Sequence, residues 1–345
     1  MILINTLYND LKSDKYFGES SKQLGQNLLL PNKELKKRLN AENIEIHTMD
    51  MFSVSEALEA DVLLFNDIPI DSWLSVKTLT DRMKYVLKRK WRRDYFYYAV
   101  KCGMRNKMIL NICEPPSVHP LSHEKRMHKY FSRILTWNDT YVEETPKLYH
   151  KLAIPQIPSN NDIFTNVPRN GYVLMASNKS SNHPNELYSL RRQFISYFEN
   201  RSLKFDLYGA GWKNLKNYKG ICDNKLSTMR MYKFCICPEN IYGEKGYITE
   251  KIFDALFAGC IPIYKGASNI KEYIPSDIFI NVDDFVKIDD IISFCECMPE
   301  EEYQKRQDRI AHFLQSKQFV DNFSVERYTS CLIKEVKEIC TQKQG

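Results

Sequence analysis

The stretch CPENIYGEKGYITEKIFDALFAGCIPIYKG, residues 237–266, passes from a polar loop to an apolar helix and then to a short apolar strand. The run KFCIC, residues 233–237, predicts a buried strand before the loop. Thr249 is a good N-cap residue because its hydroxyl can accept a hydrogen bond from a backbone N–H of the first helical turn. Gly259 stands where a helix usually ends. The loop is therefore expected at the carboxyl end of a strand and at the N-terminus of a helix.

A ligand at this loop is expected to be anionic, because backbone N–H groups and the helix dipole favour negative charge there. Lys251 adds a full positive charge and suits a diphosphate. Glu250 would be repelled by phosphate but could accept hydrogen bonds from a ribose diol. Tyr247 offers a ring and a hydroxyl to the same nucleoside. The other interpretation is a solvated loop followed by a capped helix.

The rest of the chain alternates short apolar runs with helical patterns, which implies parallel sheets with helices on both faces. Residues 153–170 interrupt this alternation with prolines and small polar residues, and they predict a linker. We expect an α/β fold with two doubly wound domains, residues 1–152 and 171–310, and a helical tail over 311–345. Because such domains bind ligands beyond the carboxyl ends of their strands, the domains are expected to face each other across a ligand-binding cleft.

The composition is that of a soluble globular protein, with 345 residues of which 43% are hydrophobic and 27% charged. The net charge of +6 favours acidic small molecules or an anionic surface and does not require nucleic acid. The chain has no apolar run of the ~18 residues that a membrane span needs, and its start, MILINTLYND, lacks the features of a secretory signal. These features predict a cytoplasmic location and reduced cysteines.

Four segments of the second half carry a family resemblance: PEN (238–240), YITEK (247–251), AGCIPIYKGA (258–267) and FINVDDF (279–285). Together they resemble the hallmark motif of glycosyltransferase family 10, the α1,3/α1,4-fucosyltransferases, although Pro238 stands where the family has an aromatic residue. The resemblance implies a soluble, bacterial-type enzyme with the two-lobed GT-B fold. It also implies inverting transfer of L-fucose from GDP-β-L-fucose to a hydroxyl of a GlcNAc-containing glycan.

The resemblance implies donor contacts for four residues of the motif. Lys251 would contact phosphate, Glu250 and Tyr247 the ribose, and Asn240 the neighbourhood of the phosphates. The family also has an arginine on the helix that follows a V-x-x-S-N strand end. The run YVLMASN, residues 172–178, fits that strand end.

Ser177 belongs to this strand end, and Arg191 on the following helix is the better match for the family's arginine, with Arg192 as the neighbour that could replace it. A guanidinium can bind two phosphate oxygens at once, but a solvated helix face is the alternative for both arginines. Gly209 and Gly211 in FDLYGAGW would let the backbone approach the nucleotide, unless they only form a turn.

Inversion requires a base near the acceptor hydroxyl, within ~3 Å of it. In KMILNICEPPSVHP, residues 107–120, Glu114 ends an apolar strand and two prolines restrict the following turn. The family's base is a Glu at a similar strand end, so the resemblance assigns Glu114 this role. The alternative is an ordinary Glu at a strand end. Lys251 and the arginine would then stabilise the departing GDP.

No tightly bound cofactor and no protein metal site are expected. His123 and His128 are spaced one residue too far apart for the H-E-x-x-H zinc motif. A free Mn²⁺ or Mg²⁺ that assists the diphosphate stays open. The expected partners are a GDP-sugar and a glycan acceptor, with no nucleic acid.

The segment 82–93 is strongly basic, and its apolar residues Met83, Val86, Leu87 and Trp91 recur at helical spacing. One interpretation is a helix whose apolar side faces the core and whose basic side is solvated. The other is a surface that meets anionic lipid or a charged acceptor, with peripheral attachment to the inner face of a membrane.

Two alternatives to the fucosyltransferase function remain at this point. One is the use of another GDP-sugar, and the other is a catalytically silent protein that binds a nucleotide-sugar or a glycan. The family's T-Y-R-x-D-S-D-like stretch is replaced here by ILTWNDTYV, residues 134–142, so the sequence does not identify the acceptor.

Overall fold

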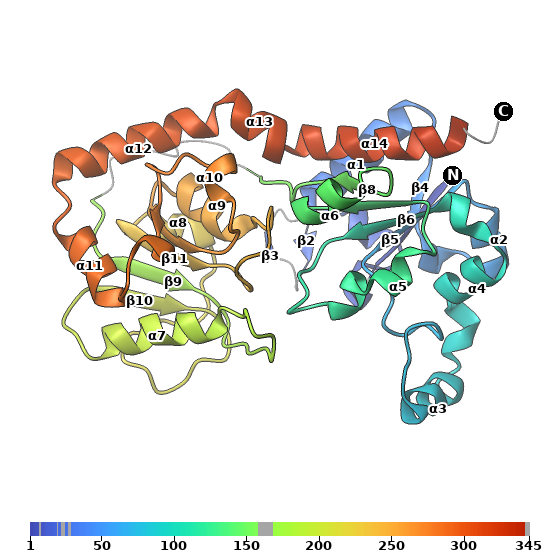
Figure 1. The fold of residues 1–345 in the computed structure, drawn as a ribbon, viewed down its shortest axis with the longest axis horizontal. Coiled ribbons are helices and arrows are strands. Elements are labelled where there is room, and N and C mark those ends of the chain that lie inside the picture. Colours follow the sequence, from blue (N-terminus) through green and yellow to red (C-terminus); the bar gives the residue numbers. More distant parts are fainter. Residues whose placement is uncertain (7, 19, 22–24, 27–28, 158–167, 342–345) are drawn as a thin grey trace. The chain divides into compact units, whose positions relative to one another are not determined.

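The structure is a computed structural model that describes residues 1–341 except 7, 19, 22–24, 27–28 and 158–167. The chain forms two compact units (Figure 1). Unit 1 consists of Met1–Ile157 and Ser324–Gly345, and unit 2 of Pro158–Phe323. The predicted linker, 153–170, spans the boundary between them, and most of it lies outside the described residues. The predicted cleft between the two domains stays a prediction.

Unit 1 is built on a parallel six-stranded sheet with the order β4-β1-β5-β6-β7-β8. The first strand, β1, pairs with β4 on one side and with β5 on the other, so the strand order reverses between β1 and β5. The strands of this sheet are β1 (Ile2–Asn5), β4 (Ile46–Thr48), β5 (Val62–Asn66), β6 (Met108–Ile112), β7 (Arg133–Thr136) and β8 (Tyr149–Lys151). The short antiparallel pair is β2 (Ser20–Ser21) and β3 (Gly25–Gln26).

Helices cover both faces of this sheet, as the alternation predicted (Figure 1). One core cluster joins β1 and β5 to α1 and α14 through residues such as Leu35 and Leu332. The other joins them to α2, α4 and α5 through residues such as Phe96 and Met127. The helices of unit 1 are α1 (Leu30–Ala41), α2 (Val54–Glu59), α3 (Leu79–Leu87), α4 (Tyr95–Lys101), α5 (Lys125–His128), α6 (Asp139–Glu144) and α14 (Val325–Thr341).

The C-terminal region, expected as a helical tail over 311–345, is divided between the two units. The helices α12 and α13 end within unit 2, and α14 returns to unit 1. Glu335 of α14 forms a 2.6 Å ion pair with Arg133 at the start of β7, and both side chains are nearly buried. Because α14 supplies part of the core of unit 1, the last helix is an integral element of that unit.

Unit 2 is built on a parallel five-stranded sheet with the order β10-β9-β11-β12-β13, which reverses between β9 and β11. Figure 1 shows α7 on one side of this sheet and α9 on the other. The strands are β9 (Tyr172–Met175), β10 (Phe205–Tyr208), β11 (Phe234–Pro238), β12 (Ile261–Lys265) and β13 (Ile280–Asn281). The helices are α7 (Tyr188–Glu199), α8 (Lys225–Met229), α9 (Glu250–Phe257), α10 (Ile270–Tyr273), α11 (Ile288–Glu296), α12 (Glu300–Leu314) and α13 (Lys317–Phe323).

The quoted stretch folds as its pattern predicts. β11 is buried at all five residues, and α9 begins directly after Thr249, whose hydroxyl accepts a hydrogen bond from the backbone N–H of Lys251. Gly259 follows α9 with φ at 72°, a left-handed conformation that favours glycine. Phe253 of α9 packs against Phe323 with their ring centroids 4.6 Å apart, and this contact fixes the helix against the rest of unit 2.

The first interpretation of the basic segment 82–93 is wrong. α3 ends at Leu87, a short 3₁₀ turn follows at Lys90–Arg93, and the apolar stripe predicted to face the core is exposed. The residue of α3 that the core buries is Tyr85. Among the described residues, no helix combines the length and the apolar character that crossing a bilayer requires.

Candidate functional site

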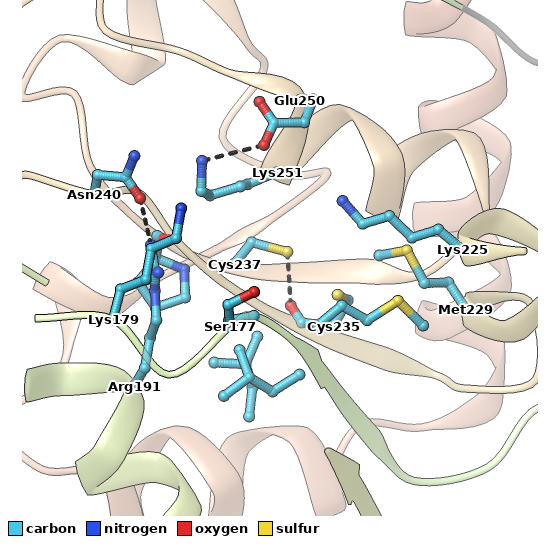
Figure 2. Close-up of a pocket in the computed structure, with 15 residues that line it drawn as sticks. Ser177, Lys179, Arg191, Lys225, Met229, Cys235, Cys237, Asn240, Glu250 and Lys251 are labelled. Atoms are coloured by element: carbon cyan, nitrogen blue, oxygen red, sulfur yellow. Dashed lines mark hydrogen bonds and ion pairs between the residues drawn. The ribbon is translucent and has the colours of Figure 1, made fainter. Parts of the chain in front are cut away.

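A cavity of about 230 Å³ lies in unit 2 at the carboxyl ends of β9 and β11, where the strand order reverses. Parallel α/β sheets bind ligands at such a reversal because the loops of adjacent strands leave in opposite directions there. Figure 2 shows the side chains that surround it, among them Lys179, Arg191, Lys225, Lys251 and Glu250. The site therefore concentrates cations at the carboxyl edge of the sheet.

A buried carboxylate, Glu239, holds the loop between β11 and α9. Its two oxygens accept hydrogen bonds from the backbone N–H of Thr249 at 2.8 Å and from the Thr249 hydroxyl at 2.7 Å. The ammonium group of Lys251 lies 3.3 Å from Glu239 and donates to the Thr249 hydroxyl at 3.0 Å. Burial raises the pKa of Glu239, and Lys251 opposes that shift. Thr249 is thus both the helix cap and the bridge that positions Lys251.

Glu250 and its neighbours form a second ionic group on the pocket wall. Lys251 contacts the Glu250 carboxylate at 3.2 Å (Figure 2), and Lys225 of α8 pairs with Asp254 one turn along α9. Burial alone would raise the pKa of Glu250, but Lys251 and Lys225 outweigh burial and lower the pKa to about 2. Glu250 is therefore ionised at neutral pH and acts as an acceptor of hydrogen bonds, the role that a ribose diol needs.

Arg191 lines the pocket, and its neighbour Arg192 does not. Nη2 of Arg191 donates to the carbonyl oxygens of Pro238 and Glu239 at 2.9 and 2.7 Å and to the side-chain oxygen of Asn240 at 3.0 Å. All three acceptors are neutral, so these contacts orient the guanidinium without neutralising it. Arg192 instead donates to the carbonyl oxygen of Lys179 at the surface, 3.0 Å away.

Three other residues that were predicted to bind the sugar donor differ in where they lie relative to the cavity. Ser177, which follows β9, lines it together with Asn240. Tyr247 is buried outside the lining and meets the pocket through the side-chain amide of Asn240, which donates to its hydroxyl at 3.5 Å. Gly209 also lies outside the lining, with φ at 133°, and a Cβ there would approach the carbonyl oxygen of Ala176 to 2.2 Å. Gly209 therefore permits close packing behind Ser177.

Sequence reasoning missed Glu239, Lys225 and Lys179. Glu239 belongs to the PEN segment. The signal that could have identified it is a carboxylate, able to accept hydrogen bonds, two residues after Cys237 at the end of the strand. Lys225 precedes Glu250 by 25 positions, and no local pattern connects them. The helical spacing could have identified Arg191 rather than Arg192 as the pocket residue, because Arg191 lies on the same buried face of α7 as Phe194 and Phe198.

In unit 1, Glu114 lies just beyond the carboxyl end of β6, as predicted. The Tyr8 hydroxyl donates to its carboxylate over 3.4 Å. Asp67, just after β5, accepts from the backbone N–H groups of Cys113 and Glu114 at 3.2 and 3.1 Å. Because Tyr8 follows β1, the three residues come from neighbouring strands around the reversal between β1 and β5.

Two aromatic rings hold the backbone of this strand end. His123 Nε2 donates to the carbonyl oxygen of Glu114 at 2.9 Å, and Trp137 Nε1 donates to that of Cys113 at 3.2 Å. Trp137 is fully buried, and its indole supports the Glu114 turn. The half-buried Glu114 carboxylate is thus presented by a turn that is fixed on both sides.

Asp67 makes the stability of unit 1 depend on pH. Burial, with a contribution from Glu114, raises the pKa of Asp67 to about 7, above the ~4 of an unfolded chain. The folded state then binds more protons between those values, so stability falls as pH rises from about 4 to 7. Asp67→Asn removes this titration. We expect its melting temperature relative to the parent chain to increase from pH 5 to pH 8, and a constant difference would contradict the assignment.

No group of three or more His, Cys, Asp or Glu side chains in the described part of the chain is arranged to hold a metal ion.

The family model described as "Glycosyltransferase family 10 (fucosyltransferase) C-term" matches residues 169–342, just over half of the chain. The chain belongs to glycosyltransferase family 10. The match includes every described residue of the pocket in unit 2, from β9 to α9. Family 10 membership therefore rests on the unit that carries the cationic site.

Curated relatives are similar to part of the chain. Alpha-(1,3)-fucosyltransferase FucT of Helicobacter pylori is 31% identical in an alignment of 184 residues that covers 46% of this chain and 38% of that protein. The human 4-galactosyl-N-acetylglucosaminide 3-alpha-L-fucosyltransferase 9 is 36% identical over 95 residues, 26% of this chain and 25% of that protein. The chain thus spans well under half of the length of these relatives.

Solved structures show the fold. The crystal structure of an alpha1,3-fucosyltransferase with GDP covers 98% of this chain and 89% of its own, with 16% identity and a TM-score of 0.53. The DNA-modifying beta-glucosyltransferase, whose substrate is uridine diphosphoglucose, covers 98% and 100% with 8% identity and a TM-score of 0.52. The GT-B fold is therefore confirmed, and since one of these two structures contains GDP and the other protein uses uridine diphosphoglucose, the fold alone does not select the nucleotide.

Proposed function

We propose that the chain is an inverting fucosyltransferase that transfers L-fucose from GDP-β-L-fucose to a hydroxyl of a glycan. The observation that carries the proposal is the arrangement of charges in the pocket. Arg191, whose hydrogen bonds go to neutral acceptors, and Lys251 both line the pocket beside an ionised Glu250, within the segment that matches family 10. The H. pylori and human relatives, named as fucosyltransferases, support the choice of sugar.

The pocket residues divide the donor between them. Lys251 and Arg191 bind the diphosphate, with Lys179 as a further cation on the wall. Glu250, held ionised by two lysines, accepts from the ribose diol. Asn240 uses its oxygen for Arg191 and positions the guanidinium. Since positive charge is in place before the reaction, it stabilises the diphosphate as the leaving group forms.

Glu114 is assigned the role of general base. Its carboxylate takes the proton of the acceptor hydroxyl while that oxygen forms a bond to the anomeric carbon of fucose. The bond from this carbon to the β-phosphate oxygen breaks, and its electron pair leaves with GDP. Attack from the face opposite the leaving group inverts the anomeric centre, so the β-linked donor gives an α-linked product.

A donor panel tests the proposal. The purified chain is incubated with GDP-fucose, GDP-mannose or UDP-glucose and an oligosaccharide panel that includes GlcNAc-containing acceptors. We expect GDP release and transfer with GDP-fucose, and an α-linkage by NMR of the product. Preferred turnover of GDP-mannose or UDP-glucose would contradict the donor assignment, and nucleotide binding without any turnover would indicate a silent binding protein.

The two neighbouring arginines offer a matched comparison. Arg191→Lys keeps the charge but loses the planar fork, and it is expected to weaken GDP binding about tenfold or more. Arg192→Lys makes the same chemical change outside the pocket and is expected to leave GDP affinity unchanged. Calorimetric titration of both variants measures this, and equal effects would contradict the assignment to Arg191.

A further inference from the structure

One face of α3 in unit 1 is apolar and exposed. Leu79, Met83, Val86 and Leu87 recur at the spacing i, i+4, i+7 and i+8, which places them on the same side of a helix. Their exposed fractions are 76%, 57%, 55% and 77%. We call these four residues the α3 face. Soluble proteins bury most side chains of this kind, so a contiguous exposed set indicates a surface for contact.

The helix is fixed in this orientation by its opposite side. The Tyr85 hydroxyl donates to the buried carboxylate of Asp94 at 2.8 Å, and Asp94 also accepts from the backbone N–H of Trp73 at 2.7 Å. Thr78 caps the helix by accepting from the backbone N–H of Asp81 at 3.1 Å. The α3 face is therefore presented outward by a packed and capped element.

Basic residues flank the α3 face. Residues 79–93 contain seven Lys or Arg and one Asp, a net charge of +6, which equals the formal net charge of the whole chain. A hollow of about 380 Å³ beside α3 is lined by four lysines, by Asp71 and Asp81, and by the exposed Ile70. The four lysines are Lys77, Lys84, Lys88 and Lys90. Apolar contact and positive charge thus occur on the same short segment.

We propose that this segment docks unit 1 on a bilayer that contains anionic phospholipid. The α3 face enters the boundary between headgroups and acyl chains, and the flanking lysines and arginines meet lipid phosphates. A second copy of the chain fits less well, because a symmetric contact would bring two +6 segments together. A neutral glycan or a nucleic acid fits less well, because neither offers a continuous apolar layer to Leu79 and Leu87.

The test is sedimentation of the full chain with vesicles. We expect binding to phosphatidylcholine vesicles that contain about 30% phosphatidylglycerol, weak binding to pure phosphatidylcholine, and a decrease with added salt. Leu79→Ser/Leu87→Ser and, separately, Lys84→Gln/Lys88→Gln are expected to weaken binding about tenfold or more. All four side chains are exposed, three on α3 and Lys88 directly after it, and an unchanged melting temperature verifies that each variant is folded.

The matched control is Ile221→Ser/Val286→Ser, which makes the same apolar loss at two exposed positions of unit 2 and is expected to bind like the parent chain. Binding of Leu79→Ser/Leu87→Ser equal to that of this control would overturn the proposal. Equal binding to neutral and anionic vesicles would overturn it too. A dimer in solution that this variant converts to monomer would assign the α3 face to self-association instead.

Discussion

Glu114→Gln is expected to lower the turnover of GDP-fucose about 100-fold or more, the effect of losing a general base. A glutamine amide cannot take the acceptor proton, but it can still accept the hydrogen bond from Tyr8. The turn itself is held through backbone groups by Asp67 and His123, and the substitution leaves these contacts in place. We therefore expect steady-state turnover to fall while the affinity for GDP is unchanged.

Glu124→Gln is the matched control for this prediction. Glu124 belongs to the same unit, is half-buried like Glu114, and pairs with Lys77 at 2.7 Å and with Arg126 at 2.6 Å. It is expected to retain the turnover of the parent chain. Turnover of Glu114→Gln equal to that of Glu124→Gln would remove Glu114 from the mechanism, whether or not the rest of the donor assignment holds.

The second large effect is expected for Lys251→Met, which keeps most of the side chain and removes its charge. Burial lowers the pKa of Lys251, but Glu250 and Glu239 outweigh burial and raise it, so the parent side chain is charged at neutral pH. The variant loses the proposed phosphate contact and leaves Glu239 and Glu250 without their shared cation. Since charged hydrogen bonds are worth about 1.5–3 kcal/mol, we expect GDP to bind about 10- to 100-fold more weakly.

Two comparisons keep this prediction separate from a loss of folding. Lys271→Met removes a lysine whose ion pair with Asp284, at 3.3 Å, is exposed, and it is expected to leave GDP affinity unchanged. Lys251→Arg retains the charge and is expected to lie between the parent chain and Lys251→Met. If Lys251→Met melts like the parent chain and binds GDP equally well, the phosphate assignment is wrong.

Much of the fold could be predicted from local pattern. The cap at Thr249 and the glycine at 259 define α9 through local backbone chemistry, and the apolar runs mark the strands. The environment of α3 could not be predicted in this way, because periodicity shows that Met83 and Leu87 share a face but not whether another element covers it. The return of α14 to unit 1 could not be predicted for the same reason, since an amphipathic helix can pack on any apolar sheet face that it reaches.

The candidate site was predictable where one segment contains its residues. Asn240, Glu250 and Lys251 lie close in sequence and close in the pocket. Lys225 and Asp67 were missed because their effects act through space, on Glu250 and on the Glu114 turn. Tyr247 shows the reverse case, in which a residue within the motif lies behind Asn240 and outside the pocket wall.

The central claim is that the pocket at the ends of β9 and β11 binds a guanosine diphosphate through Lys251 and Arg191. Calorimetric titration of the chain with GDP, GMP and UDP tests it most directly. We expect GDP to bind about tenfold or more tightly than GMP, because the second phosphate meets the two cations, and more tightly than UDP. Equal affinities for GDP and GMP, or stronger binding of UDP, would contradict the account.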